Sequence, residues 1–244
     1  MLGLTHTGLF NSVEAADALS QGIMIARSIG WEGGLSTTLL AMGRLKTQLG
    51  DYREAEELLQ ESISTARHIR DRFRLAQALH QMGECFRQQS KLNESAPVLE
   101  EACLLWRELS QQRSSKWVAD TLVELKGSQG DWKGALFWRD HIISVCRSQQ
   151  DHLEVTNQLE LKGEILLTAQ RYDEAALHFE AAIVTAKENG HTWSSKRMRL
   201  CTIPKVDMKW ERRVRLVCDV KKLQRRLPQL VTASLKIPLP SGRE

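Results

Sequence analysis

The chain has 244 residues, of which 42% are hydrophobic and 26% charged, and its formal net charge is +4. No apolar run approaches the roughly 18 to 20 residues that a membrane span requires, and the N-terminal stretch MLGLTHTGLF lacks the features of a signal peptide. The sequence therefore indicates a soluble protein without a transmembrane segment, whose expected compartment is the cytoplasm. Sparse aromatic residues, at 6%, and only five prolines favour helices over a turn-rich β fold.

The charges are divided unevenly along the chain. Residues 1–195 hold 20 Lys+Arg against 26 Asp+Glu (20 − 26 = −6), whereas residues 196–244 hold 14 against 4 (14 − 4 = +10). We therefore expect two regions, a domain over 1–194 and a basic tail over 195–244.

A repeat of 40 residues runs through the first region. The segments GDYREAEELLQES, SKLNESAPVLEEA, GDWKGALFWRDHI and QRYDEAALHFEAA begin at 50, 90, 130 and 170. Aligned in rows of 40, the chain shows one column of glycines, one of small residues and one of basic residues. Their members are Gly3, Gly43, Gly83, Val123 and Gly163; Ala15, Ala55, Ser95, Ala135 and Ala175; and Arg27, Arg67, Arg107, Arg147 and Lys187.

The first row starts at Leu2-Gly3, partway through the first helix of a unit. This indicates either a piece of a longer protein or a gene model with a misplaced start.

Each full row reads as two helices. In the second row, apolar residues recur at helical spacing in two runs. The runs are Leu35, Leu39, Met42 and Leu45, and then Ala55, Leu58, Leu59, Ile63 and Ala66. Between them, Gly50 can end one helix and Asp51 can cap the next, and Gly130 with Asp131 repeats the arrangement. A Gly column facing an Ala column lets the two helices cross closely.

The pattern resembles the tetratricopeptide repeat, a helix–turn–helix unit with the signature W-x2-L-G-x2-Y followed by Ala, Phe and Pro. The matching residues are Leu39, Met42, Gly43, Ala55 and Leu59; Leu79, Met82, Gly83, Phe86, Leu99 and Ala102; and Leu159, Gly163, Leu166, Ala175, Phe179 and Ala182. The 40-residue form is similar to the arrays of STAND-type NTPases (NB-ARC or NACHT proteins) and of kinesin-light-chain-like adaptors.

The resemblance implies an all-α, right-handed α-solenoid of about four and a half helix–turn–helix units. The usual period is 34, so we expect the six extra residues to form additional helical turns and a longer connection. Val123, Lys126 and Arg139 depart from the pattern at core positions, and this row is expected to be the softest.

No motif for catalysis or for a cofactor occurs. The sequence lacks G-x-x-x-x-G-K-[ST], H-E-x-x-H and G-x-S-x-G. The cysteines, Cys85, Cys103, Cys146, Cys201 and Cys218, are odd in number and form no C-x-x-C pair. We expect no enzyme activity, no metal and no cofactor.

In the family the first helix of each unit lines a concave groove, so partner-binding residues can be placed by their distance from the Gly column. The candidates are Arg44, His80, Glu84, Arg87, Trp117, Asp120, Glu124, Asn157, Glu160 and Glu164. The acids among them favour a basic or amphipathic peptide, which Trp117 would anchor. A solvated helix face with no partner is the alternative.

The family's chaperone-binding members hold a peptide carboxylate with Lys and Asn at two of these columns. Here the columns contain Leu40, His80, Asp120 and Glu160, and Arg44, Glu84, Glu124 and Glu164. The sequence therefore does not predict binding to chaperone tails by that route.

The tail leaves three interpretations open. An apolar stripe with basic neighbours predicts one amphipathic helix, and Pro228 ends it; the stripe is Trp210, Val214, Val217, Val220, Leu223 and Leu227. The helix could cap the last repeat, bind an acidic partner such as nucleic acid or anionic lipid, or have no selected function. The predicted function is non-catalytic protein–protein interaction, as a scaffold or as the sensor segment of a larger signalling protein; the alternative is a nucleic-acid or anionic-surface binder that uses the tail.

Overall fold

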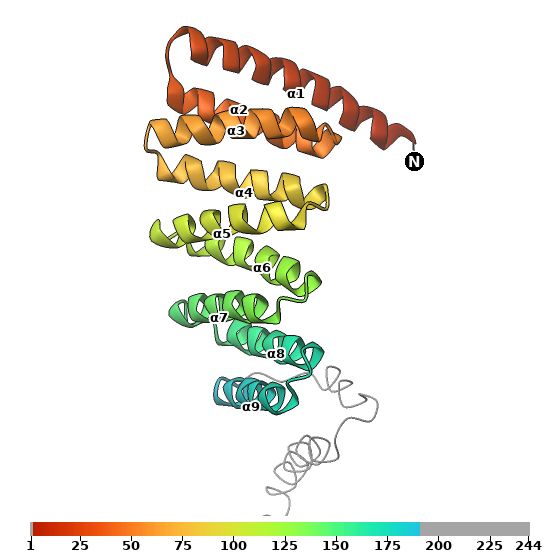
Figure 1. Ribbon diagram of the computed structural model, residues 1–244, viewed down its shortest axis with the longest axis vertical. Coiled ribbons are helices and arrows are strands. Elements are labelled where there is room, and N and C mark those ends of the chain that lie inside the picture. Colours follow the sequence, from red (N-terminus) through yellow and green to blue (C-terminus); the bar gives the residue numbers. More distant parts are fainter. Residues whose placement is uncertain (1, 191–244) are drawn as a thin grey trace, which may run out of the picture. The chain divides into compact units, whose positions relative to one another are not determined.

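The computed structural model describes the backbone of residues 2–190 and the side chains from Ser12 to Gly190. Within this range the chain is entirely α-helices and short turns (Figure 1). The helices in chain order are α1 (Leu2–Ser28), α2 (Glu32–Leu49), α3 (Tyr52–His68), α4 (Arg72–Gln88), α5 (Leu92–Glu108), α6 (Gln112–Ser128), α7 (Trp132–Ser148), α8 (His152–Thr168) and α9 (Tyr172–Glu188). The helix predicted in the basic tail lies outside the described residues.

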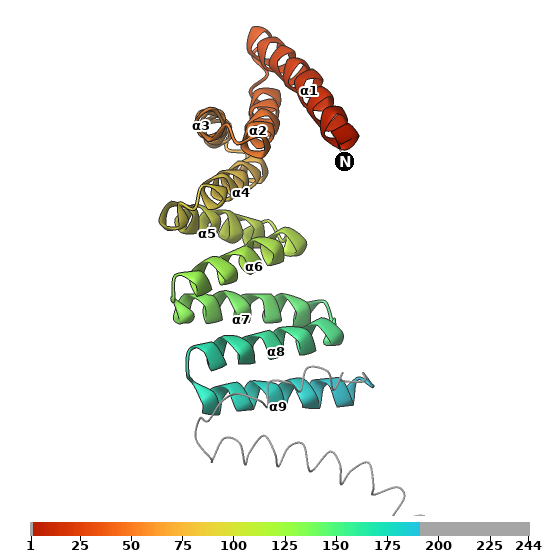
Figure 2. The same cartoon turned by 90° about the vertical axis from the view of Figure 1, so that its right-hand side faces the viewer.

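The chain divides into two compact units, Met1–Val145 and Cys146–Glu244. In the first unit the helices follow one another in chain order, and each packs against the next (Figure 2). The pairs α2/α3 and α4/α5 make the most extensive contacts there, and α8/α9 does so in the second unit. These pairs are the helical hairpins that the two-helix rows predict, and the all-α repeat fold is confirmed.

Two expectations about lengths are wrong. The connections are not longer: two or three residues separate neighbouring helices throughout 2–190, so the extra residues of each repeat lengthen the helices to 17 or 18 residues from α2 onward. The first row does not open with a fragment of a separate helix either, because α1 runs without a break for 27 residues.

A residue with positive φ ends each helix at intervals of 20 residues. Four of these residues are glycines, and five are not: Arg70, Ser90, Ser110, Gln150 and Gln170. The N–H of the following residue then donates to the carbonyl five residues earlier, as from Lys91 to Phe86 at 2.9 Å. This is the Schellman motif, which satisfies helix-end carbonyls through a left-handed residue. The helix-ending role predicted for Gly50, whose φ is 84°, is confirmed.

Asp side chains cap only some of the helices. The Asp131 carboxylate accepts a hydrogen bond from the Gly134 N–H at 2.9 Å, as predicted. Asp51 makes no such bond; its carboxylate lies 3.8 Å from Lys46 Nζ instead.

The non-glycine turn residues give a stability prediction. We expect Ser90→Gly and Ser110→Gly each to raise the free energy of unfolding by about 0.5–1 kcal/mol, because a left-handed conformation costs a residue with a Cβ about 1–2 kcal/mol and the freer unfolded glycine offsets part of the gain. Gly50→Ser is the matched reverse change and should lower it by a similar amount. Urea unfolding measures all three, and a loss of stability on Ser90→Gly would contradict the assignment.

The Gly column makes close helix contacts. A Cβ on Gly43 would lie 2.6 Å from Leu59 Cγ, and one on Gly83 would lie 2.4 Å from a methyl carbon of Leu99. Leu59 and Leu99 are fully buried, so neither can move aside freely. The close helix packing that the sequence predicts at the Gly column is confirmed, although the side chain that each glycine meets is the leucine four residues after the Ala column.

The first two members of the basic column form ion pairs between successive repeats. The Arg27 guanidinium donates to both Glu61 carboxylate oxygens, at 2.6 and 2.9 Å. Arg67 repeats the arrangement with Glu101 at 2.9 and 3.2 Å. The separation is 34 residues in both cases. Because these pairs are largely exposed, each contributes at most about 1 kcal/mol.

Candidate interaction surface

Most of the predicted partner-binding residues of the first unit lie on α4 and α6. We call the surface made by His80, Glu84 and Arg87 of α4 and Trp117 and Glu124 of α6 the α4/α6 face. Trp117 is 67% exposed although it is the largest side chain on this face. Its ring meets the His80 ring edge to face, with centroids 5.3 Å apart. Such a contact favours this orientation of the indole at the surface.

Charged groups lie beside the aromatic pair. The Arg87 guanidinium and the Glu84 carboxylate form an ion pair at 2.8 Å. Glu84 and Glu124 both raise the pKa of Arg87, the Glu84 hydrogen bond contributing most. The face therefore holds two carboxylates and one guanidinium, a formal charge of −2 + 1 = −1.

Asp120 has a structural partner. Its carboxylate accepts a hydrogen bond at 3.0 Å from Arg139 of α7, whose side chain is 8% exposed. Removing Asp120 would leave a buried guanidinium without this partner, which is costly. Asp120 therefore supports the fold, and its substitution cannot separate binding from stability.

The remaining candidates lie elsewhere. Arg44 is exposed on α2. Asn157, Glu160 and Glu164 lie on α8 in the second unit, where Asn157 Nδ2 donates to Glu154 Oε2 at 3.3 Å and Glu160 is only 4% exposed. Their role in partner binding stays a prediction.

Arg74 of α4 links two helices in a way that the sequence interpretation missed. Its Nε donates to Thr37 Oγ1 of α2 at 3.1 Å, and its guanidinium pairs with Asp71. The signal was available, since Arg74 lies nine residues before Gly83 and so continues the stripe of which His80 is a member.

Two histidines of the first unit have a pKa that the fold lowers. Burial lowers the pKa of His80 below 6.5, and the Glu84 carboxylate opposes this only in part. Burial and the charge of Arg107 lower the pKa of His141, whose Nε2 lies 2.7 Å from the Ser115 hydroxyl.

These shifts predict a loss of stability in acid. Below pH 6.5 the unfolded chain takes up protons that the folded chain resists, so the free energy of unfolding falls until the pH passes the lowered pKa values. We expect His80→Gln/His141→Gln to lose less stability than the natural chain between pH 7.5 and 5. Thermal melts across this range measure it, and parallel pH profiles would contradict the assignment.

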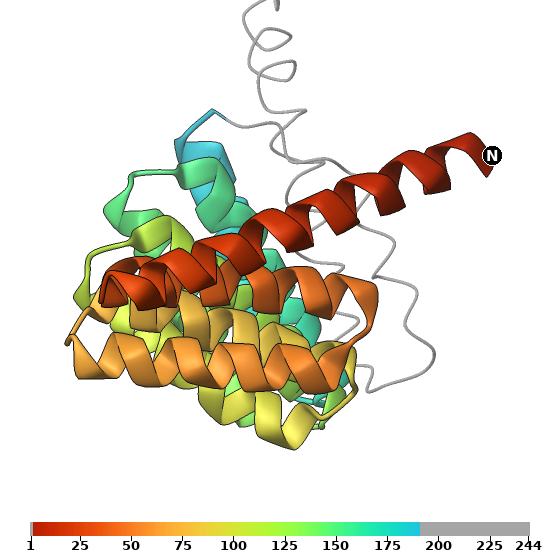
Figure 3. The same cartoon turned by 90° about the horizontal axis from the view of Figure 1, so that it is seen from above.

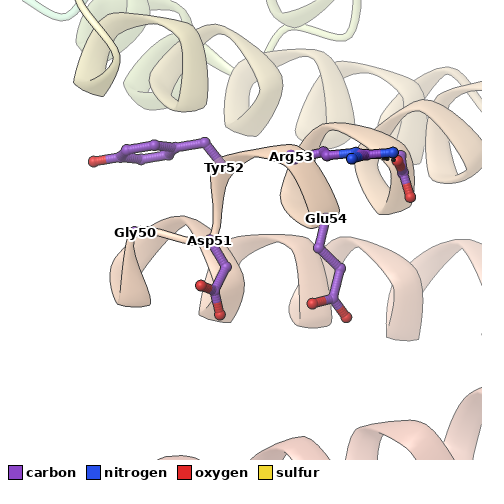
Figure 4. A pocket seen from close by; sticks show the side chains of 6 residues that line it. Gly50, Asp51, Tyr52, Arg53 and Glu54 are labelled. Atoms are coloured by element: carbon purple, nitrogen blue, oxygen red, sulfur yellow. Dashed lines mark hydrogen bonds and ion pairs between the residues drawn. The ribbon is translucent and has the colours of Figure 1, made fainter.

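The described surface also has a shallow depression at the turn between α2 and α3 (Figure 4). It is lined by Gly50, Asp51, Tyr52, Arg53, Glu54 and Glu57. Glu54 already pairs with Lys46 at 2.7 Å, and Arg53 with Glu57 at 3.4 Å. The depression is open to solvent, unlike the concave and largely apolar pockets that hold small molecules.

Features of other protein classes do not appear in the part that the structure describes. Among residues 2–190, no group of three or more His, Cys, Asp or Glu side chains is placed to hold a metal ion. None of the described helices has the length and apolarity needed to cross a bilayer.

The fold and the contacts above define an α-helical repeat protein, and comparisons with known proteins give its family. Residues 34–108 match the tetratricopeptide repeat model, and residues 122–198 match that of anaphase-promoting complex subunit 5. No curated protein matches the sequence. The comparisons thus identify tetratricopeptide repeats over residues 34–108, as the sequence pattern predicts.

Solved structures share the fold at low sequence identity. BtubC (BKLC) from P. vanneervenii has a TM-score of 0.56 and 14% identity, covering 96% of this chain and 95% of that one. A single-residue variant of a Podosopora anserina putative kinesin light chain, with nearly identical TPR-like repeats, has a TM-score of 0.58 and 14% identity, covering 78% and 93%. A Rap protein complexed with Competence and Sporulation Factor has a TM-score of 0.52 and 14% identity, covering 72% and 59%.

Proposed function

We propose that the chain is a non-catalytic protein-binding scaffold, and that its α4/α6 face holds a basic or amphipathic segment of a protein partner. The observation that carries the proposal is the exposure of Trp117, 67% of whose surface is open to solvent while His80 holds the ring in place. Tryptophan is enriched among the few residues that dominate binding energy at interfaces. An orientation fixed before binding lowers the entropy lost on association.

The charges around Trp117 select the chemistry of the partner. Glu124 is exposed on α6, and it gives the face its excess negative charge. A Lys or Arg of the partner can approach this carboxylate and also stack on the indole, because the faces of aromatic rings attract cations. An apolar side chain next to that cation would cover the rest of the ring.

One of the structural relatives supports the proposal. The Rap protein was solved in complex with Competence and Sporulation Factor, so this fold is compatible with holding another molecule. We extend to the present chain only the expectation that its surface binds a partner.

Selecting peptides from a displayed random library against the full chain tests the proposal. We expect the selected peptides to contain a basic residue beside an apolar one, and Trp117→Ala to weaken their binding at least about 10-fold, a loss of about 1.4 kcal/mol. Phe137→Ala is the matched control, since Phe137 is also an exposed aromatic residue, at 59%, but lies on α7. Fluorescence anisotropy of labelled peptides measures the affinities.

A charge reversal gives a second test of the proposal. Glu124→Lys should weaken the same peptides while leaving the melting temperature unchanged, because Glu124 is exposed. If selected peptides bind Trp117→Ala and Glu124→Lys as tightly as the natural chain, the α4/α6 face is only a solvated helix surface.

A further inference from the structure

His80 is the residue of the α4/α6 face that can change its charge near neutral pH. Its ring is half-buried on α4 and meets the Trp117 indole edge to face, with centroids 5.3 Å apart. Histidine is the side chain whose ordinary pKa places its change of charge between pH 5 and 8, whereas carboxylates and guanidinium groups ordinarily keep their charge there. The pH therefore acts on this face through His80.

The surroundings of His80 keep its ring mainly neutral above pH 6.5. Burial lowers the pKa of His80 from 6.5, and the Glu84 carboxylate, one turn further along α4, opposes this only in part. Glu84 also forms an ion pair with the Arg87 guanidinium at 2.8 Å. At neutral pH the imidazole is therefore an uncharged aromatic support for Trp117, and it lies beside an ion pair whose charges cancel.

Charged groups also lie on the helices around α4. α4 contacts α2, α3 and α5 of the same unit, and these helices overlap when the unit is seen from above (Figure 3). The groups at the columns of His80 and Glu84 on α2 and α6, and those that join α3 to the start of α5, are Arg44, Asp120 and Glu124, and Glu56 with Lys91. The charge that shifts the pKa of His80 is nevertheless that of Glu84, on α4 itself. The response of His80 to pH is therefore set by its own helix and by its burial.

Protonation of His80 changes what the face offers to a cation. A Lys or Arg of the partner would stack on the Trp117 indole, because the faces of aromatic rings attract cations. The charges of Glu84, Arg87 and a neutral His80 sum to zero on α4, and protonation makes the sum −1 + 1 + 1 = +1. The imidazolium is then a positive charge a few ångströms from the place of the partner's cation, and like charges at that distance repel even in water.

We propose that His80 is a pH switch of the α4/α6 face, which binds a basic segment while the imidazole is neutral and releases it when the imidazole is protonated. The switch rests on the proposed function, because it regulates the same surface. Binding and protonation are linked, so the factor by which protonation weakens the affinity for the segment equals the factor by which the bound segment weakens proton binding at His80. A factor of about 10 in the affinity corresponds to a decrease of about one unit in the pKa of His80 on binding.

The affinity of library-selected peptides that lack histidine, measured against pH, tests the switch. We expect their dissociation constant to rise at least about 5-fold between pH 7.5 and 5.5 in the full chain, with circular dichroism confirming that the chain is folded at both values. His80→Phe keeps an aromatic ring beside Trp117 but removes the titrating group, so its dissociation constant should change less than about 2-fold. His141→Gln is the matched control, because the fold also lowers the pKa of His141 but this residue lies on α7, and it should keep the full pH dependence.

NMR titration of the His80 ring checks the linkage from the other side. Its signals, assigned by their loss from His80→Phe, should titrate at a pH lower by about 0.7 unit or more when a selected peptide is bound. Peptides that bind equally well at both pH values, a pH dependence that persists in His80→Phe, or an unchanged titration overturn the switch and leave the proposed function standing. If no selected peptide depends on Trp117, the proposed function fails and the switch fails with it.

Discussion

Replacing Gly83 with leucine should destabilise the first unit by about 3 kcal/mol or more, the upper end of the cost of overpacking a core. A Cβ at this position already lies 2.4 and 2.5 Å from two carbon atoms of Leu99, which is fully buried. The remaining atoms of the leucine have no space between α4 and α5, so the two helices must separate. Urea unfolding should show the loss.

Gly127→Leu is the matched control for that change. Gly127 is also a helical glycine, but the nearest side-chain atom to its Cβ position is 3.9 Å away, on Trp132. This substitution should be neutral or stabilising, because leucine favours the helix over glycine by about 1 kcal/mol. Stability in a repeat array is approximately a sum of neighbour contacts. Hydrogen exchange in Gly83→Leu should therefore rise in α4 and α5 more than in α8 and α9, and a uniform rise across the chain would contradict this picture.

The second large effect is expected at the equivalent position of the third hairpin, where the pattern is broken. Gly43 faces Leu59, Gly83 faces Leu99 and Gly163 faces Phe179. At the same two columns α6 and α7 have Val123 and Arg139, and both are buried. A larger residue thus replaces the glycine, and a charged one, paired with Asp120, replaces the apolar side chain.

Changing both residues should restore the apolar pair. We expect Val123→Gly to lower the free energy of unfolding by about 1–3 kcal/mol, because it leaves a cavity. Arg139→Leu should lower it by about 1 kcal/mol, because it removes one hydrogen-bond partner of Asp120. The double variant should be more stable than the sum of the two effects by at least about 1 kcal/mol, because the equivalent columns meet in the other hairpins and neighbouring residues are coupled. Additive losses in the double-mutant cycle would show that the two columns do not compensate each other.

Much of the fold could be predicted because the 40-residue repeat places residues with the same packing role in the same column. The Gly column requires close helix contact wherever it recurs, and Gly50 ends a helix as its neighbours predict. The left-handed turn residues were harder to predict, because Arg70 and Gln150 have no local preference for positive φ. They adopt it because they occupy the position, repeated every 20 residues, at which a helix ends. The unbroken α1 was not predicted, although the first row has Phe10 and Asn11 where the second row has Gly50 and Asp51.

The candidate site was predicted less completely, because position along a helix does not determine exposure. Asp120 and Glu160 share a column with His80, three residues before the Gly column. Spacing predicts that all three line a groove. In the structure this column is half-buried in α4 and α6 and buried in α8. The column that follows the glycines is more open, so Glu124 is a better probe of binding than Glu160.

Hydrogen exchange of the full chain, with and without a library-selected peptide at saturating concentration, tests the central claim most directly. The account predicts slower exchange in α4 and α6, around His80 and Trp117, and the loss of this protection when the peptide is added to Trp117→Ala. Protection confined to other helices, or protection of α4 and α6 that persists in Trp117→Ala, would contradict the claim that this face holds the partner.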